Sequence, residues 1–378
     1  MIVGIVGSGA MGSGIAQVAA MAGEEVRLFD KSKEATSKAI QNIQGSINRL
    51  VEKDKLSPSE GVAAIGRIFI CDQLDTLKDC DLIIEAVIEN LSVKKEIFIE
   101  LESLVSASCI LATNTSSLSI ASIASSLQQP ARCIGIHFFN PPFMMKLVEI
   151  IPAIQTETKI ISKMNNLIES WGKIVVVARD TPGFIVNKVA RPYYSESIRI
   201  MEEGIANIYE IDQVMTSHGF KMGPFALMDF IGHDINYRVT ESVWKSFYFD
   251  SKYRPSFTQL RLLEAGFLGR KSGRGFYNYS DKSESVEYEI NKELSDRVFM
   301  RIISMLINEA ADTVGQQICS EDDVELSVKF GVNYPKGLFE WGKELGFKKI
   351  VSILDDLFDT YHEERYRVCR YLRNLAKL

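Results

Sequence analysis

The sequence predicts an α/β protein with a Rossmann-like, doubly wound, mostly parallel sheet, followed by two all-α helical domains. Three observations lead to this prediction. Short apolar runs rich in β-branched residues alternate with longer helical patterns from Ile2 to about Val177, as in parallel sheets that are buried on both faces. A glycine-rich turn connects the first run to the first helical pattern. After RDTPGFIVNKV, which contains Pro182 and Gly183, helical periodicity replaces the strand pattern.

The expected elements of the first half follow in a simple order. The strand IVGIV precedes a helix that runs through Ala22, and VRLF precedes a long polar helix from Lys33 to about Lys53. The later segments are, in order, LIIEAV, KKEIFIELESLV, CILAT, RCIGIHFF, KLVEIIPA, a helix through Trp171, and IVVVA.

Length and composition exclude several classes of protein. A chain of 378 residues suits two or three domains, and 46% hydrophobic and 24% charged residues are ordinary for a globular protein. The net charge of -6 argues against a general nucleic-acid surface, which needs a basic excess. Met1 leads directly into an apolar strand, and no run reaches about 18 apolar residues. We therefore expect a cytoplasmic protein that binds neither nucleic acid nor membrane.

The cysteines are scattered and form no CxxC pair, and no histidine cluster accompanies them. We expect free, mostly structural thiols in a reducing compartment, and no metal site. The six residues are Cys71, Cys80, Cys109, Cys133, Cys319 and Cys369.

We expect three domains. The domain with the strand pattern is expected to span residues 1–182, a helical domain 183–280, and a second helical repeat 290–378. A charged segment poor in apolar residues, from Ser280 to Asp296, is expected to link the two helical domains.

The two helical domains are expected to be an internal duplication. MGPFALMDFIG resembles KGLFEWGKELG, and each follows a short helix that is expected to begin with an acidic residue, Asp212 or Glu325. Coincidence is the alternative, because the match consists of G-x-F, a terminal glycine and helical spacing.

The segment GIVGSGAMGSGIAQVAAMAG has the G-x-G-x-x-G spacing, directly after a strand and at the start of a helix. The first glycine permits a tight turn, the second lets the backbone approach a pyrophosphate, and the third lets the helix pack closely on the strand. The expected cofactor-binding residues of this turn are Gly7, Gly9, Ala10, Met11 and Gly12.

Asp30 strengthens this prediction because it ends VRLFD, about 20 residues after the turn. Its carboxylate can accept hydrogen bonds from both adenosine ribose hydroxyls and would repel a 2′-phosphate, which favours NAD over NADP. Lys31 beside it weakens the preference. The alternative is a glycine-rich turn that happens to precede a surface aspartate.

Polar residues follow two later strands. Glu85 and Glu89 follow LIIEAV, with Lys94 in the next helix, and hydroxyls from Thr113 to Ser119 follow CILAT. These residues either cap helices or line the crevice at the carboxyl ends of the strands. No G-x-S-x-G motif selects one hydroxyl as a nucleophile.

His137 ends the strand in GIHFFNPPFMMKLVEII, and Glu149 lies in the next strand. If the intervening NPPFMMK is a tight excursion, the two side chains meet across neighbouring strands. A carboxylate bonded to one imidazole nitrogen fixes the tautomer and leaves the other nitrogen free to take a proton. A satisfied core histidine is the alternative, but the position at the cofactor edge of the sheet favours chemistry.

The turn GRKSGRGFYNY contains Arg270, Lys271 and Arg274. It is either a solvated basic turn or a group of cations that contacts an anionic ligand.

Together these segments resemble the L-3-hydroxyacyl-CoA dehydrogenases, including 3-hydroxybutyryl-CoA dehydrogenase. The matching segments from Met1 to about Tyr279 are GSGAMGSGIAQ, EAVIENLSVKKEIF, TNTSSLSI, GIHFFNPPFMMKLVEII, DTPGFIVNKV, GPFALMDFIG and GRKSGRGFYNY. The rest resembles a second copy of the helical domain, as in longer members of the family.

The resemblance implies reversible, NAD-linked oxidation of (S)-3-hydroxyacyl-CoA to 3-ketoacyl-CoA, in fatty-acid β-oxidation or a related pathway. It implies that His137 is the general base and that Glu149 orients it. Ser116 and Asn187 match polar residues near the substrate hydroxyl and the thioester carbonyl.

The resemblance also implies the ligand contacts. Asp30, Glu89, Lys94, Asn140 and Lys271 match cofactor contacts. Ser46 and Lys53 match positions near CoA, and a lysine beside a nucleotide phosphate is chemically sensible.

The helical half departs from the family pattern. HGFKMGPF is one residue shorter before Gly-Pro, and His233 replaces a residue that is more often apolar, so the acyl length is left open. The second copy has Lys343 for Asp229 and Leu338 for Pro224, which indicates a structural copy.

Two rival functions are left open: a dehydrogenase of a free 3-hydroxy acid or sugar acid such as L-gulonate, and a non-catalytic NAD-binding protein. Short family members dimerise through the helical domain. We therefore expect either a homodimer or a monomer in which the tandem copies bury the same surface.

Overall fold

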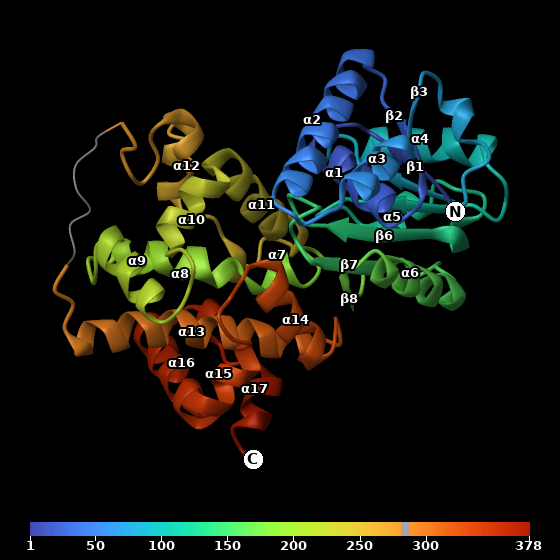
Figure 1. The fold of residues 1–378 in the computed structure, drawn as a ribbon. Coiled ribbons are helices and arrows are strands. Elements are labelled where there is room, and N and C mark those ends of the chain that lie inside the picture. Colours follow the sequence, from blue (N-terminus) through green and yellow to red (C-terminus); the bar gives the residue numbers. More distant parts are fainter. Residues whose placement is uncertain (281–287) are drawn as a thin grey trace. The chain divides into compact units, whose positions relative to one another are not determined.

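The computed structural model describes residues 1–280 and 288–378. Its contacts divide the chain into two compact units, Met1–Phe184 and Ile185–Leu378. Figure 1 shows that the first contains the sheet and the second is helical. The predicted fold class is confirmed, whereas the domain limits at residues 182 and 290 stay predictions.

The first unit contains an eight-stranded sheet of order β3-β2-β1-β4-β5-β6-β7-β8. Neighbouring strands are parallel except β6 and β7, which are antiparallel. The strands are β1 (Ile2–Val6), β2 (Glu25–Phe29), β3 (Ile68–Cys71), β4 (Leu82–Glu85), β5 (Ile110–Thr113), β6 (Cys133–Phe138), β7 (Leu147–Pro152) and β8 (Ile174–Val177).

Helices cover both faces of this sheet. Helices α1, α2 and α6 bury apolar side chains in one core cluster with the strands, whereas α4 and α5 pack together outside that cluster. Every residue of β4, β5 and β6 is buried, as a parallel sheet covered on both faces requires. The helices are α1 (Ala10–Met21), α2 (Lys33–Glu52), α3 (Pro58–Gly66), α4 (Leu91–Leu104), α5 (Ile120–Ala124) and α6 (Thr158–Ser170).

The predicted carboxyl ends of α1 and α2, at Ala22 and about Lys53, lie one residue beyond the ends in the structure, Met21 and Glu52. The sequence analysis missed α3 and β3. Strand β3 has only four residues and lies at the edge of the sheet, where Phe69 and Ile70 are about half exposed. Such a strand lacks the long buried run that marks the inner strands.

Lys173 ties down the connection between β6 and β7. Its ammonium group donates hydrogen bonds to the backbone oxygens of Pro142 (2.6 Å) and Met145 (2.9 Å). Burial lowers the pKa of this lysine to about 8, because no carboxylate accompanies it. Lys173, which directly precedes β8, therefore fixes the NPPFMMK segment that connects β6 and β7.

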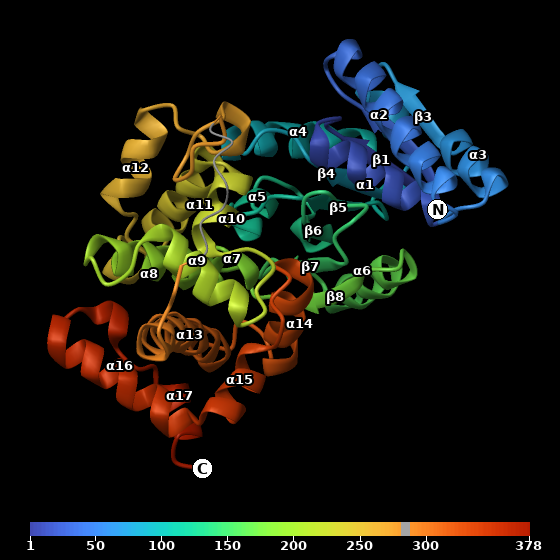
Figure 2. The ribbon, with the colours of Figure 1, turned by 60° about the vertical axis from the view of Figure 1, so that its left-hand side comes forward.

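The second unit consists of helices throughout its described residues. A short helix, α7 (Val186–Val189), leads into α8 (Arg191–Glu202). Figure 2 shows α13 with α14, α15, α16 and α17 around it, and each of the four contacts it. The others are α9 (Ile208–Ser217), α10 (Pro224–Ile231), α11 (His233–Ser246), α12 (Phe257–Glu264), α13 (Lys292–Gly315), α14 (Glu321–Gly331), α15 (Leu338–Leu345), α16 (Phe347–Tyr361) and α17 (Arg370–Leu375).

The two halves of this unit use the same capping interaction. Asp212 accepts the backbone N–H groups of Phe225 and Ala226 at the start of α10. Glu325 accepts those of Phe339 and Glu340 at the start of α15. These matching interactions support the internal duplication.

Two expectations in this unit were wrong. Asp212 and Glu325 lie one turn inside α9 and α14, because Asn207 and Ser320 cap the starts of these helices. The expected linker from Ser280 to Asp296 includes helical residues, because Asn291 caps α13 and Lys292–Asp296 form its first turns. Residues 281–287 of that linker lie outside the described residues.

Within the described ranges, no helix is long and apolar enough to cross a membrane.

The turn between β1 and α1 depends on Gly12 for steric reasons. A Cβ atom at Gly12 would lie 1.8 Å from the backbone oxygen of Gly7, whereas one at Gly9 would meet no heavy atom within 4 Å. We expect Gly12→Ala to lower the free energy of unfolding by roughly 2 kcal/mol or more, because the backbone must shift. Gly9→Ala is the matched control and should lower it much less. Urea titrations that give both variants the same stability would contradict this explanation.

Candidate active site at the carboxyl ends of the strands

Several predicted site residues of the first unit lie at the carboxyl ends of strands, on either side of the point where the strand order reverses. The chain passes from β1 to β2 and β3 on one side, then returns to β4 and β5 on the other. Doubly wound sheets bind ligands in the crevice at the carboxyl ends of strands at such a point. The ends of β1, β2, β4, β5 and β6 carry the residues described below.

The glycine turn has the geometry that a dinucleotide requires. Gly7 has a φ of +102°, which favours glycine, and Gly12 lets α1 approach the turn closely. Gly9 precedes α1 without any side-chain cap, so the N–H groups at Ala10 and Met11 face outward from the first turn. These groups fit a pyrophosphate.

Asp30 follows β2 beside this turn. Its carboxylate accepts hydrogen bonds from the backbone N–H (2.8 Å) and hydroxyl (3.0 Å) of Ser8 and from the N–H of Ser32 (3.0 Å). Burial alone would raise the pKa of Asp30, but these hydrogen bonds lower it below its usual value. The carboxylate is therefore ionised and fixed, as a ribose contact requires.

Glu85 and Lys94 form a buried ion pair at the end of β4. Their Oε1 and Nζ atoms lie 2.7 Å apart, and both side chains are at most 1% exposed. Thr113, at the end of β5, donates to the other Glu85 oxygen. Lys94, an expected cofactor contact, lies inside this cluster, with Glu89 3.4 Å away.

Glu89 binds the polar loop after β5. Its carboxylate accepts the hydroxyl of Thr115 (2.6 Å), the N–H of Ser116 (3.0 Å) and the hydroxyl of Ser117 (3.1 Å). Although burial opposes ionisation, Lys94 and these donors lower the pKa of Glu89. The capping alternative is wrong for Glu85 and Glu89, because Asn90 caps α4. It is correct for Ser119, which caps α5.

His137 and Glu149 are directly paired. They lie opposite each other in the antiparallel register of β6 and β7, and His137 Nδ1 lies 2.6 Å from Glu149 Oε2. The prediction that these side chains meet across neighbouring strands is confirmed. Since a carboxylate only accepts, a neutral imidazole in this pair would carry its proton on Nδ1 and leave a lone pair on Nε2.

Several neighbours of this pair were missed by the sequence analysis. The rings of Phe139 and Phe184 lie 4.5 Å and 5.8 Å from the imidazole. Asn114 Oδ1 accepts the backbone N–H of Phe138 (2.8 Å) and so links the polar loop to β6. Asn114 lies in the quoted TNTSS segment, but the aromatic residues carry no sequence signal that separates them from core residues.

The remaining predicted site residues of the first unit lie in α2, just after α2, and in the connection between β6 and β7. Ser46 is buried in α2, and the exposed Lys53 follows its last turn on the same face. Asn140 is exposed at the start of the excursion between β6 and β7.

Two predicted residues belong to the helical unit. Asn187 is half-buried in α7, and Lys271 forms an ion pair with Asp234. The basic turn is anchored by Asp229, which accepts the N–H groups of Phe276 and Tyr277. His233 also binds Asp229 (2.8 Å).

Cys71, Cys80, Cys109, Cys133 and Cys369 are free thiols. The part of the chain that the structure describes contains no cluster of three or more residues suited to hold a metal ion.

Comparison with known proteins identifies the same organisation. The model of the 3-hydroxyacyl-CoA dehydrogenase NAD binding domain matches residues 2–181. The model of the 3-hydroxyacyl-CoA dehydrogenase C-terminal domain matches residues 183–279 and 298–378. The latter match falls in two segments, one in each helical half.

Relatives of two lengths match the chain. The 3-hydroxyadipyl-CoA dehydrogenase of Escherichia coli K12 is 34% identical over 100% of this chain and 97% of its own length. A probable 3-hydroxybutyryl-CoA dehydrogenase of Bacillus subtilis is 42% identical over 74% of this chain and 97% of its own.

A solved structure of 3-hydroxybutyryl-CoA dehydrogenase from Escherichia coli K12 superposes on this chain with a TM-score of 0.94 at 34% identity, covering 100% of this chain and 98% of that one. Since the two domain models span nearly the whole chain, the protein belongs to the 3-hydroxyacyl-CoA dehydrogenase family and is an NAD-dependent oxidoreductase of that class.

Proposed function

We propose that the protein oxidises (S)-3-hydroxyacyl-CoA, such as 3-hydroxybutyryl-CoA, reversibly to 3-ketoacyl-CoA, with His137 as the general base. The observation that carries the proposal is the 2.6 Å contact between His137 and Glu149 at the cofactor edge of the sheet. A buried carboxylate on Nδ1 leaves Nε2 able to accept a proton.

In this mechanism Nε2 of His137 takes the proton of the 3-hydroxyl group. The NAD that the Gly7–Gly12 turn and Asp30 would hold would supply the acceptor for the hydride that leaves C3 of the substrate. Glu149 holds the imidazole ring in one orientation and stabilises its positive charge after proton transfer, because an opposite charge lies within hydrogen-bond distance. In the reverse direction the same imidazolium returns the proton.

Other residues hold the reactants. We propose that Ser116 donates a hydrogen bond to the substrate hydroxyl and that Asn187 binds the thioester carbonyl, where it would stabilise enolate-like charge. Gly7, Gly9, Gly12 and Asp30 would hold the cofactor. The longer list of cofactor and CoA contacts comprises Ala10, Met11, Glu89, Lys94, Asn140, Lys271, Ser46 and Lys53.

The free cysteines are consistent with a reducing compartment, and we propose a cytoplasmic enzyme. The proposed pathway is fatty-acid β-oxidation or a related degradation route.

The substrate class is tested by comparing steady-state NADH formation from 3-hydroxybutyryl-CoA, a medium-chain 3-hydroxyacyl-CoA, 3-hydroxyadipyl-CoA and L-gulonate. The dicarboxylic substrate is included because the full-length Escherichia coli relative is named for it. We expect a kcat/KM at least about 100-fold higher for one of the CoA esters than for L-gulonate, because the acid lacks the CoA contacts. A preference for L-gulonate would instead support the free-acid rival.

The catalytic pair is tested by His137→Ala, Glu149→Gln and the double variant. We expect His137→Ala to lower kcat by about 10²–10⁴, as loss of a general base does. Glu149→Gln should act through the same imidazole, so the double variant should be no slower than His137→Ala. His218→Gln, which removes a histidine that binds the backbone of Val214, is the control and should retain the rate. Full activity of the double variant would support a role for other residues in the proton transfer.

We propose that the chain is a pseudo-dimeric monomer. The support is that α8 packs along α13, its counterpart in the second copy, and we infer that this contact takes the place of the dimer contact of short members. Light scattering should give the mass of one chain at all concentrations. A dimer that persists on dilution would show instead that the chain uses a separate interface.

A further inference from the structure

Two buried clusters of the same kind lie inside the helical unit. In the first, Glu309 of α13 accepts the ammonium group of Lys188 (2.6 Å) and the hydroxyl of Tyr253 (2.7 Å). In the second, Glu196 of α8 accepts Nε of Arg301 (2.6 Å) and the hydroxyl of Tyr366 (2.9 Å). Both carboxylates are completely buried.

The clusters are counterparts of each other. Lys188, Glu196 and Tyr253 are followed by Arg301, Glu309 and Tyr366 after the same number of residues. Each cluster joins the two helical copies. The glutamate of one copy binds the lysine or arginine and the tyrosine of the other copy. Duplication therefore produced two reciprocal ion pairs.

The residues that precede the two cations differ. Asn187, proposed to bind the thioester carbonyl, precedes Lys188. At the equivalent place, the apolar Met300 precedes Arg301. Only the cluster that contains Glu309 is therefore covalently adjacent to a proposed substrate residue.

Helix α7 needs such an anchor because it has only four residues and one turn. Lys188 is completely buried and also donates to Thr313 (2.9 Å), one turn beyond Glu309 in α13. Asn187, about 100° away around the helix, is half-buried. The anchor at Lys188 thus sets the backbone direction at Asn187.

We propose that Glu309, in the second helical copy, is a positioning residue that holds Asn187 in place through Lys188. The inference rests on the proposed role of Asn187. It gives the second copy a part in catalysis, although that copy lacks the Asp229 anchor and has Lys343 there.

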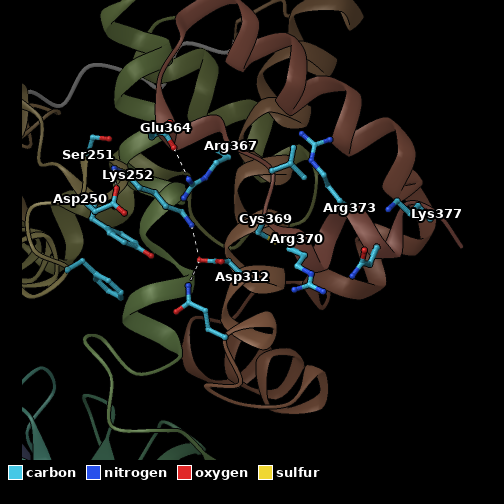
Figure 3. Close-up of a pocket in the computed structure, with 15 residues that line it drawn as sticks. Asp250, Ser251, Lys252, Asp312, Glu364, Arg367, Cys369, Arg370, Arg373 and Lys377 are labelled. Atoms are coloured by element: carbon cyan, nitrogen blue, oxygen red, sulfur yellow. Dashed lines mark hydrogen bonds and ion pairs between the residues drawn. The ribbon is translucent and has the colours of Figure 1, made fainter.

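Glu309 also has a second cationic partner, Lys252, which lines a cavity. Lys252 binds Glu309 (2.6 Å) and Asp312 (3.2 Å), and Figure 3 shows Lys252 and Asp312 among the residues that line this cavity of about 810 Å³. The cavity contains none of the predicted site residues. Lys252→Met therefore removes a partner of Glu309 other than Lys188.

The test compares Glu309→Gln with its counterpart Glu196→Gln, measuring kcat, both KM values, NADH affinity and thermal stability. Each variant removes one buried carboxylate from an equivalent cluster, so both should lose stability. We expect Glu309→Gln to lower kcat by about 10- to 100-fold, as misplacement of a catalytic group does. NADH affinity should change less than about twofold, since the NAD-binding turn is in the other unit. Glu196→Gln should keep kcat within about twofold.

A double-mutant cycle with Asn187→Ala separates the possibilities. If Glu309 acts through Asn187, Glu309→Gln should cost no further activity in the Asn187→Ala background. If the two losses multiply, the positioning role is overturned while the proposed function stands. If Asn187→Ala alone retains full kcat, the proposed role of Asn187 fails, and with it the inference.

Thr313→Val is the alternative test of the positioning role if the Glu309→Gln variant does not fold. It keeps the charge balance and removes only the second acceptor of Lys188. We expect a drop in kcat of about three- to tenfold that disappears in the Asn187→Ala background, whereas Lys252→Met should leave kcat within about twofold. A Thr313→Val enzyme with unchanged kcat, or one slowed no more than Lys252→Met, would overturn the proposal.

Discussion

The antiparallel pairing of β6 with β7 is the constraint on which the site depends. Every other neighbouring pair in the sheet is parallel, and this reversal sets His137 directly opposite Glu149. Because side chains alternate along a strand, a register shift of one residue would send Glu149 to the other face. Lys173 holds the excursion that sets this register, through two backbone carbonyls.

Around this pair, the ends of parallel strands supply fixed polar groups. Glu85 and Lys94 neutralise each other inside the protein, and Glu89 orders the loop that contains Ser116. Asn114 joins that loop to the strand of His137. Ionised groups can stay at this edge because each has a partner or several donors, since an unpaired buried charge would be strongly unfavourable. The site is thus a connected polar network rather than a set of independent residues.

The helical unit shows how duplication creates reciprocal contacts. An acid in each copy binds a cation and a tyrosine of the other, so neither copy satisfies its buried charges alone. The repeat was visible in the sequence only as two short similar segments. The equivalence of Glu196 and Glu309 became apparent once their partners were known, because an isolated glutamate in a helix has no pattern that distinguishes an exposed from a buried one.

The sequence by itself determined the fold class, the strand–turn–helix at Gly7 to Gly12, the acid at Asp30 and the candidate pair of His137 and Glu149. These follow from local rules: β-branched runs form strands, glycines permit close backbone approach, and strand periodicity decides which side chains share a face. Only the tertiary structure decided that Lys94 is buried against Glu85, that Lys173 ties down the β6–β7 connection, and that Glu309 reaches Lys188. Those contacts join residues far apart in the chain, and their strength depends on burial and on distances that no local pattern contains.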